Sequence, residues 1–493
     1  MFLIIIIIDL YIFTKYNKID KNAKDVYCVA KKEKHVPNKL YDLIPSQDAM
    51  YLMFKYGIHK NMSQIPSSFT IKTDMDFDIL QKAFNIVIER NDCLRLRFLK
   101  VGKELKQYFR EPYTYEIPML HFDSLEEQDE FFSKDAKKPV MFTKDEIFRA
   151  YFYKTKGANI GLYINFTHLV IDAMGISNFF LDYLDVYNAL FEGRELPPAP
   201  AKYEDYIIEE HQRMSNRKKM ERHERFYKEY FLKGGEPYYA GIHGGEFLDK
   251  YRKKKKNPDL RVPLAYNPIY DKCDMITKHI APEDAKKIAQ YCIEKQIAPE
   301  SIFQFGLRCH CSKVNSRIND VSMMAVCSKR ATKKEKTMCG CLAQPIQIRT
   351  ILSEGLTFDE AINEMVAVRT SLYRHVEYPY TKARTMSLDI YGFSPIQGPN
   401  SMMFSWIPLP VEGEFGFDFE FKTYNLGRYF TPLYTITMPD PEDLGINMCY
   451  MYRTKLSTKE DIELLHKNTV KAIVMGIENP SMTLGEILDG LCE

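Results

Sequence analysis

Net charge is nearly absent from this sequence. Its 493 residues carry 68 Lys and Arg side chains against 66 Asp and Glu side chains, which gives a formal charge of +2. A nucleic-acid binder that neutralises phosphates needs a clear basic excess, so this class of function is disfavoured. The 11 cysteines are too sparse for a small disulfide framework, which favours a reducing cytoplasm as the location.

Several motifs of known chemistry are also missing. No G-x-G-x-x-G follows a predicted strand, so a dinucleotide site has no support. The run from Gly175 to Phe179 lacks the second glycine of a G-x-S-x-G turn, which disfavours a serine hydrolase. Cys309-His310-Cys311 and Cys339-Gly340-Cys341 lack the spacing of zinc ligands, and we place the first run in a helix and the second in a strand. We therefore expect no metal and no bound cofactor.

A hydrophobic run long enough to span a membrane is missing as well. The most apolar stretch, Phe2 to Phe13, is shorter than the about 20 residues that cross a bilayer, and Asp9 interrupts it. No basic residue precedes it, although a secretory signal would need one. We interpret this run as an extra strand or as sequence upstream of the fold, in preference to a membrane anchor.

What is present suits a globular α/β protein. Hydrophobic residues make up 45% of the chain and charged residues 27%, and the length suits about two to three domains. Both halves mix predicted strands with predicted helices, which favours α/β lobes over a bundle or a sandwich. We predict a leader over residues 1–39, an N-terminal lobe over 40–195, a connector over 196–270 and a C-terminal lobe over 271–493.

The chain is organised around residues 159–191, which predict a strand, a sharp turn and a long helix. Apolar and polar side chains alternate up to Thr167, which is the period of a half-buried strand. From Ile176 the apolar residues recur every three or four positions, which indicates an amphipathic helix, and Gly193 is its predicted C-terminal stop. His168 therefore lies at the end of a strand, where a sheet holds a side chain rigidly beside a cleft.

Three other local signals define elements. Asp76 is a predicted N-cap for a helix over 77–90. Residues 94–98 alternate as a strand whose second face carries Arg95 and Arg97. Residues 457–460, Ser-Thr-Lys-Glu, are a predicted capping box for the last long helix.

His168 is the first candidate for chemistry. The unperturbed pKa of histidine, about 6.5, allows it to accept a proton near neutral pH, as a general base must. A hydrogen-bonded core histidine is the alternative interpretation. Asp172 follows four residues later, so a hydrogen-bonded pair of the two side chains is conceivable from the spacing alone.

The pattern His168-x-x-x-Asp172 resembles the H-x-x-x-D-G signature of the chloramphenicol acetyltransferase-like acyltransferases, and the chain is most similar to nonribosomal peptide synthetase condensation domains. A single short motif is weak support, but further resembling runs follow in the expected order over roughly residues 40 to 480. These runs are Ile44 to Tyr51, Glu89 to Phe98, Tyr203 to Tyr206, Gly340 to Arg349 and His375 to Pro379.

The resemblance implies a fold and a set of roles. It implies two chloramphenicol acetyltransferase-like lobes, each a mixed sheet with helices, that form a V around a central tunnel. The resemblance assigns His168 as the general base and Asp172 as an aspartate that turns away from the tunnel to pair with an arginine, Arg95 first and Arg90 second. Ser405 would face His168 from the second lobe and donate to an oxyanion. Thr167, Met174 and Gly175 would line the tunnel, and residues 411–425 would bridge the lobes.

The sequence departs from the family pattern at two positions. Thr167 stands where many condensation domains carry a second histidine. Ala173 stands where the pattern has glycine, so a turn that needs a positive φ there would be strained.

The resemblance therefore implies a freestanding condensation-type acyltransferase. It would move an acyl group from a phosphopantetheine thioester, carried by an acyl or peptidyl carrier protein or by coenzyme A, to an amine or an alcohol. An alcohol or lipid O-acyltransferase that uses acyl-CoA is the alternative among enzymes, and a non-catalytic condensation-like binding module is the alternative outside them. We expect a cytoplasmic monomer, and the sequence specifies neither the acyl group nor the acceptor.

Overall fold

The first half of the chain folds around a five-stranded mixed sheet in the computed structural model, which describes residues 39–73, 75–144, 146–157, 160–408, 419–440 and 442–492. The strand order of this sheet is β12-β2-β7-β6-β5, and a three-stranded sheet, β1-β4-β3, lies in the same half. The elements are β1 Tyr41–Asp42, α2 Pro45–Tyr56, β2 Gln64–Ile71, α3 Phe77–Arg90, β3 Leu96–Val101, β4 Glu104–Phe109, β5 Met119–Phe122, α4 Leu125–Asp135, β6 Phe148–Thr155, β7 Ile160–Thr167 and α5 Ala173–Glu192.

The predicted strand with its alternating faces is confirmed as β7 for its described residues, but the prediction that it is half-buried was wrong, because all eight residues are buried; Asn159 lies outside the described residues. Ile164 and its even-numbered neighbours face α3 and α5 in the core of the first lobe. Tyr163 points to the opposite face, where its ring stacks on Phe132 of α4 with 4.3 Å between the ring centroids. Both faces of β7 are thus covered, which fixes the register of the strand that leads to His168.

The two helices on this sheet begin and end where local signals indicate. Asp76 caps α3, because its carboxylate accepts hydrogen bonds from the backbone N–H groups of Asp78 and Ile79. α5 begins at Ala173, three residues before the apolar periodicity becomes visible. It ends at Glu192, and Gly193 is the C-cap, whose φ of 67° is the left-handed conformation that glycine adopts readily.

The prediction of a strand over residues 94–98 was partly wrong. Asp92–Arg95 form a 3₁₀ turn, and β3 begins only at Leu96. The chain turns inward here because Leu94 is fully buried in the core of the lobe. Arg97 is not on a solvated face: its side chain is buried, and its guanidinium lies 5.2 Å from the ring centre of Tyr113.

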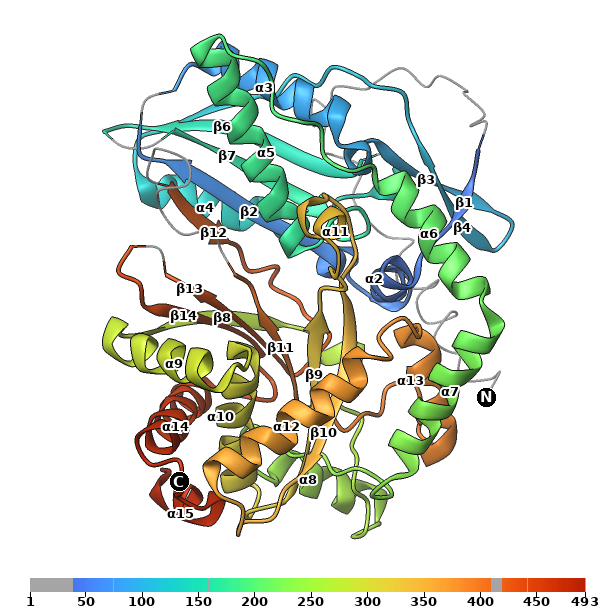
Figure 1. Ribbon diagram of the computed structural model, residues 1–493, viewed down its shortest axis with the longest axis vertical. Helices are drawn as coiled ribbons and strands as arrows, with labels where there is room; N and C mark the ends of the chain where they lie inside the picture. Colours follow the sequence, from blue (N-terminus) through green and yellow to red (C-terminus); the bar gives the residue numbers. More distant parts are fainter. Residues whose placement is uncertain are drawn as a thin grey trace. The chain divides into compact units, whose positions relative to one another are not determined.

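The second half folds around a six-stranded mixed sheet with the order β10-β9-β11-β13-β14-β8. Helices α9, α10, α12 and α14 pack on one face of this sheet and enclose the second main core (Figure 1). The elements are β8 Cys273–Ile280, α9 Pro282–Lys295, α10 Pro299–Val314, β9 Asp320–Cys327, α11 Lys333–Thr337, β10 Gln344–Ile351, α12 Phe358–Tyr373, α13 Tyr380–Tyr391, β11 Met402–Trp406, β12 Phe419–Thr423, β13 Leu433–Pro439, β14 Ile446–Arg453, α14 Lys459–Glu478 and α15 Leu484–Gly490.

The capping box of α14 is shifted by one residue from its predicted position. Thr458, not Ser457, is the N-cap, and Asp461 completes the reciprocal hydrogen bonds in place of Glu460. Ser457 is buried, so its neighbour is the residue that is free to cap the helix.

Two segments of the second half belong structurally to the first. β12 pairs antiparallel with β2, so it forms an edge of the first sheet (Figure 1). This agrees with the predicted bridge over residues 411–425, of which 411–418 lie outside the described residues. The segment between α11 and β10, from Met338 to Leu342, is also buried in the first core. Cys339 and Cys341 lie in this segment and not in the predicted strand.

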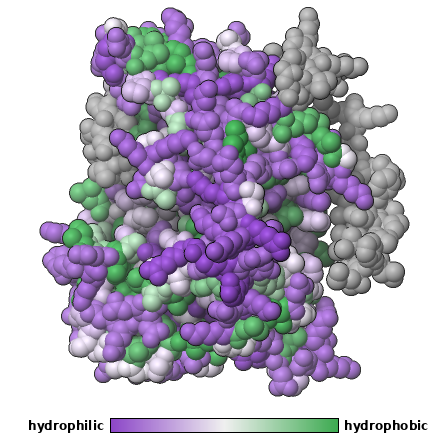
Figure 2. All heavy atoms as spheres, turned by 45° about the vertical axis from the view of Figure 1, so that its right-hand side comes forward, coloured by the Kyte–Doolittle hydropathy of each residue, from purple (hydrophilic) through white to green (hydrophobic). Residues whose placement is uncertain are grey.

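Three helices connect the halves: α6 Tyr203–Ser215, α7 Arg217–Leu232 and α8 Glu246–Lys255. α6 places Tyr206 in the first core, whereas α7 places Tyr227 in the second. α6 and α7 lie on the side of Figure 1 that comes forward in Figure 2, and that face is mostly hydrophilic. Within the described ranges, none of the helices combines the length and the apolar character needed to traverse a bilayer. The apolar run over residues 2–13 lies outside these ranges.

Candidate active site

His168 follows β7 directly, in the turn that leads to α5. β7 is bonded on both sides, to β2 and to β6, so the end of this strand is held in place. The backbone N–H of His168 donates to the carbonyl of Ser63, 2.8 Å away, just before β2 begins. The side chain is partly exposed, and Nδ1 is its buried nitrogen. The predicted position of His168 at a strand end is thus confirmed, and the cleft predicted beside it stays a prediction.

The surroundings keep His168 neutral. Burial lowers its pKa below 6.5, because the charged imidazolium loses water. The backbone at His168 and Ile171 and the negative charge of Asp172 oppose this shift without cancelling it. At pH 7 the ring therefore has a free lone pair, which is the form that a general base requires.

Asp172 is the N-cap of α5 and is almost completely buried. Its carboxylate accepts hydrogen bonds from the backbone N–H groups of Gly175 at 2.7 Å, Leu342 at 2.8 Å and Ala343 at 2.9 Å. Burial raises its pKa, but the charge of Arg330 and these amides outweigh burial and hold the pKa below 3.8. Asp172 is thus an ionised anchor of the turn, and none of its hydrogen bonds goes to His168.

The arginine that pairs with Asp172 is Arg330, and the predictions of Arg95 and Arg90 were wrong. Arg330 Nη2 lies 2.8 Å from Asp172 Oδ1, and both side chains are buried. Arg95 donates instead to the carbonyl of Arg110. Arg90 pairs with Asp182 on α5, 3.4 Å away. Both arginines bind partners within the first half of the chain, whereas Arg330 comes from the loop after β9 in the second half.

Two small residues let the second half close over the turn. A Cβ on Gly175 would lie 2.8 Å from the carbonyl oxygen of Gly340, so only glycine allows this approach. Gly340 itself has a φ of 152° and accepts a hydrogen bond from the backbone N–H of Asp172. Ala173 is the first residue of α5 and is not among the residues with positive φ, so the departure from glycine there causes no backbone strain.

The other predicted site residues have different surroundings. Thr167 is buried, and its hydroxyl has no hydrogen-bond partner among the described residues. Met174 is partly exposed, whereas Gly175 is buried beneath Gly340. Ser405 lies in β11 on the face that carries Met403, opposite the helical layer, and its Oγ is 2.8 Å from the hydroxyl of Tyr434.

The predicted tunnel past His168 stays a prediction. One hollow lies near Tyr378 and Gln344. A second, of about 440 Å³, lies between the end of β8 and the C-terminal half of α14 and includes His279 and His466. Neither includes His168. The cysteines of the first disfavoured zinc motif are free and buried in α10, and His310 Nε2 lies 2.7 Å from the carbonyl of Ile242.

Comparison with known families decides the identity of the fold. The condensation-domain model matches residues 38–488. The chain belongs to the condensation-domain family. Condensation domains generally catalyse amide-bond formation, so family membership supports an acyltransferase reaction at this level.

Curated relatives of this condensation domain are much longer than the chain itself. It is 22% identical over 472 residues to surfactin synthase subunit 1 of Bacillus subtilis (strain 168), which covers 91% of this chain and 12% of that protein. It is 21% identical over 467 residues to bacitracin synthase 3 of Bacillus licheniformis, with coverages of 91% and 7%. The chain thus spans only a small part of the length of either relative.

Solved structures confirm the two-lobed α/β fold of the condensation domain. The first condensation domain of the CDA synthetase superposes with a TM-score of 0.73 at 14% identity, covering 93% of this chain and 100% of that one. A mutant starter condensation domain of rhizomide synthetase, in complex with C8-CoA and Leu-SNAC, gives 0.75 at 14% identity, with coverages of 92% and 98%.

Proposed function

We propose that this condensation domain transfers an acyl group from a phosphopantetheine thioester to an amine or an alcohol, with His168 as the general base. The observation that carries the proposal is the placement of His168. A neutral, partly exposed imidazole stands at the end of a central strand, and its turn is fixed by the buried pair of Asp172 and Arg330.

The reaction needs one group that accepts a proton and one group that donates a hydrogen bond to the oxyanion. The nitrogen or oxygen of the acyl acceptor attacks the thioester carbonyl carbon, and the carbonyl electron pair moves to oxygen. His168 takes the proton from the attacking atom through Nε2, since Nδ1 is buried. The oxyanion then reforms the carbonyl, the C–S bond breaks, and the imidazolium returns the proton to the leaving thiolate.

Ser405 is our candidate donor to the oxyanion. The hydroxyls of Ser405 and Tyr434 are hydrogen-bonded, and Tyr434 can donate in that pair. In that arrangement the Ser405 hydrogen is available to the developing negative charge. Asp172 takes no proton in this scheme; it keeps the turn in place.

The donor and the partners follow from the same chemistry. We propose a carrier-bound or coenzyme A thioester as donor and a small amine or alcohol as acceptor. The rhizomide starter domain supports this choice, because it has been solved with C8-CoA and Leu-SNAC. The monomeric state and the cytoplasmic location stay predictions.

The test is incubation of the purified protein with acyl-CoA, acyl-SNAC and carrier-bound thioesters, each with a panel of amines and alcohols, followed by mass spectrometry. His168→Ala is the matched control. An amide product absent from the control supports the proposal, and an ester product identifies an O-acyltransferase. Thioester binding without turnover across the panel would instead identify a binding module.

A further inference from the structure

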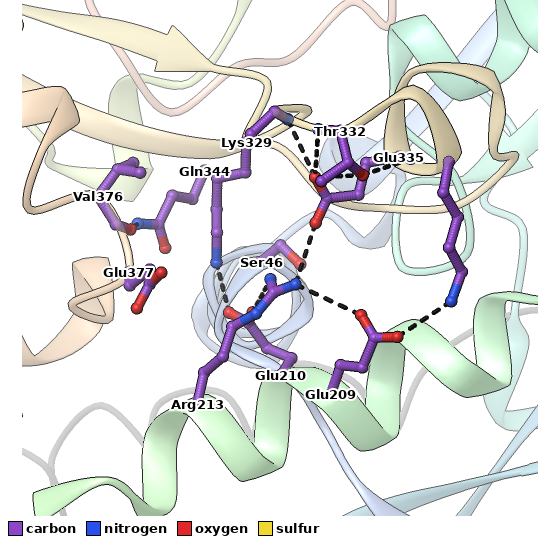
Figure 3. Close-up of polar contacts among 12 residues, drawn as sticks. Ser46, Glu209, Glu210, Arg213, Lys329, Thr332, Glu335, Gln344, Val376 and Glu377 are labelled. Carbon is purple, nitrogen blue, oxygen red and sulfur yellow. Dashed lines mark hydrogen bonds and ion pairs between the residues drawn. The ribbon is translucent and has the colours of Figure 1, made fainter. Parts of the chain in front are cut away.

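A buried ion pair lies one residue from the arginine that holds the active-site turn. The Lys329 ammonium contacts the carboxylate of Glu210 on α6, and the two side chains are 3% and 1% exposed. Figure 3 shows Lys329 reaching from the loop after β9 to Glu210, with Arg213 and Glu335 beside them. Arg213 Nη1 lies 3.2 Å from Glu210, and Arg213 Nη2 lies 3.1 Å from Glu335.

The backbone at Lys329 needs this support. Its φ of 54° is left-handed, a conformation that non-glycine residues adopt only when their surroundings hold them there. The next residue, Arg330, donates through Nη1 to the carbonyls of Glu335 and Met338 and through Nη2 to Asp172. The direction of the Arg330 side chain therefore depends on the strained residue before it.

The contacts form a continuous series from α6 to the base. Glu210 holds Lys329, the backbone of Lys329 directs Arg330, and Arg330 pairs with Asp172. Asp172 caps α5 and closes the turn that begins at His168. α6 packs on the first core, whereas Lys329 follows β9 of the second sheet, so this ion pair also joins the two halves beside the turn.

We propose that Glu210 is a positioning residue of the active site, acting on His168 through Lys329, Arg330 and Asp172. The proposal deepens the acyltransferase function and rests on it. It assigns the connector helix α6 a part in maintaining the catalytic geometry, because a displacement of about 1 Å at a reacting group can reduce a rate up to about 100-fold.

The test compares charge-removing and charge-keeping variants in acyl transfer. Glu210→Gln and Lys329→Met should each lower kcat at least about tenfold while the KM of the acyl donor stays within about twofold. Lys329→Arg keeps the ion pair and should retain most of the rate. Glu209→Gln is the matched control on the same helix: Glu209 is 44% exposed, binds the partly exposed Lys334 at 3.0 Å and lies 3.4 Å from Arg213.

A second readout does not depend on activity. The backbone amides of Gly175, Leu342 and Ala343 donate to Asp172, so their hydrogen exchange reports the state of the turn. Exchange at these amides should be at least about tenfold faster in Glu210→Gln, with exchange in β6 unchanged and Glu209→Gln like the wild type. The exchange measurement tests the positioning role of Glu210 even if the wild type transfers no acyl group. Absence of acyl transfer in the wild type would refute only the proposed function.

Unchanged exchange at the three amides of a folded Glu210→Gln protein would overturn the proposal. Faster exchange across the whole first lobe would also overturn it, because the pair would then act only on stability. If Glu210→Gln does not fold, the double variant Glu210→Gln/Lys329→Met removes both charges together, which proteins often tolerate. The same local increase is expected in that variant, and wild-type exchange in it would overturn the proposal.

Discussion

Replacing Arg330 by methionine tests the anchor of the active-site turn. Methionine keeps an unbranched side chain but removes the guanidinium. Arg330 now contacts Asp172 at 2.8 Å and the carbonyls of Glu335, Met338 and Gly340 at 2.6, 2.7 and 3.2 Å. All four contacts would be lost, and the Asp172 carboxylate would remain buried without its counter-charge.

The expected loss of stability follows from the burial of the pair. The side chains of Arg330 and Asp172 are 2% and 3% exposed. Removing one partner of such a pair lowers the free energy of unfolding by about 3 to 5 kcal/mol. Unfolding entropy is about 2.1 cal/mol/K per residue, so a cooperative unit of this length should melt about 3 to 5 °C lower. If the first lobe unfolds on its own, the shift in melting temperature is about three times as large, because that lobe is about a third of the chain.

The assay is thermal unfolding of the wild type, Arg330→Met, Asp172→Asn and the double variant. The double variant should lose less stability than the two single losses together, because each single change already breaks the same contact. Arg95→Met is the control, since Arg95 is partly exposed and makes a backbone contact of its own with Arg110. It should melt within about 1 °C of the wild type.

The loss of stability in Arg330→Met should also depend on pH, and it should become smaller in acid. The folded-state pKa of Asp172 lies below 3.8, so its stabilising contribution is complete above that value and is lost as the pH falls through the folded-state pKa. The gap between the wild type and Arg330→Met should therefore be full above about pH 5 and should narrow in stronger acid. An Arg330→Met protein that melts like the wild type at pH 7, or an Arg95→Met protein that loses as much, would refute this reasoning.

Three further predictions concern the turn itself. His168→Ala should melt within about 1 °C of the wild type, yet its acyl-transfer rate should be about 10² to 10⁴-fold lower. An unchanged rate would remove His168 from the mechanism. Because burial holds the pKa of His168 below 6.5, kcat should be flat through neutral pH and fall only in acid as the ring becomes protonated; a rate still rising above pH 7 would contradict this assignment. Gly175→Ala should lower the free energy of unfolding by about 1 to 3 kcal/mol through its clash with Gly340, as measured by urea titration. Ala173→Gly should leave kcat unchanged in steady-state assays.

Local features of the fold could be predicted because their signals lie within a few residues. Asp76 and the helix that it caps are adjacent in the sequence, and the alternation along β7 needs only neighbouring residues. The same short range explains the error at Ser457, since Thr458 beside it is also a preferred N-cap residue. Burial chose between them, and burial depends on distant parts of the chain.

The partner of Asp172 could not be predicted in this way. Arg330 lies 158 residues further along, and no periodicity links the two positions. Arg95 and Arg90 were nearer in the sequence and equally basic, so the residues alone gave no reason to prefer Arg330. The one signal was the pair Lys329-Arg330, one residue after the buried strand β9. Such a pair is usually solvated, and only the crossing of the second half over the turn encloses it.

The position of β12 makes each half of the chain incomplete without the other. A fragment that ends in the connector would leave β2 with a bare hydrogen-bonding edge, which is an open template for aggregation. The complementary fragment would carry a strand that has no sheet to join. Residues from Lys39 onward form one compact unit. The two lobes should therefore be kept together whenever the protein is expressed, shortened at an end or fused to another protein.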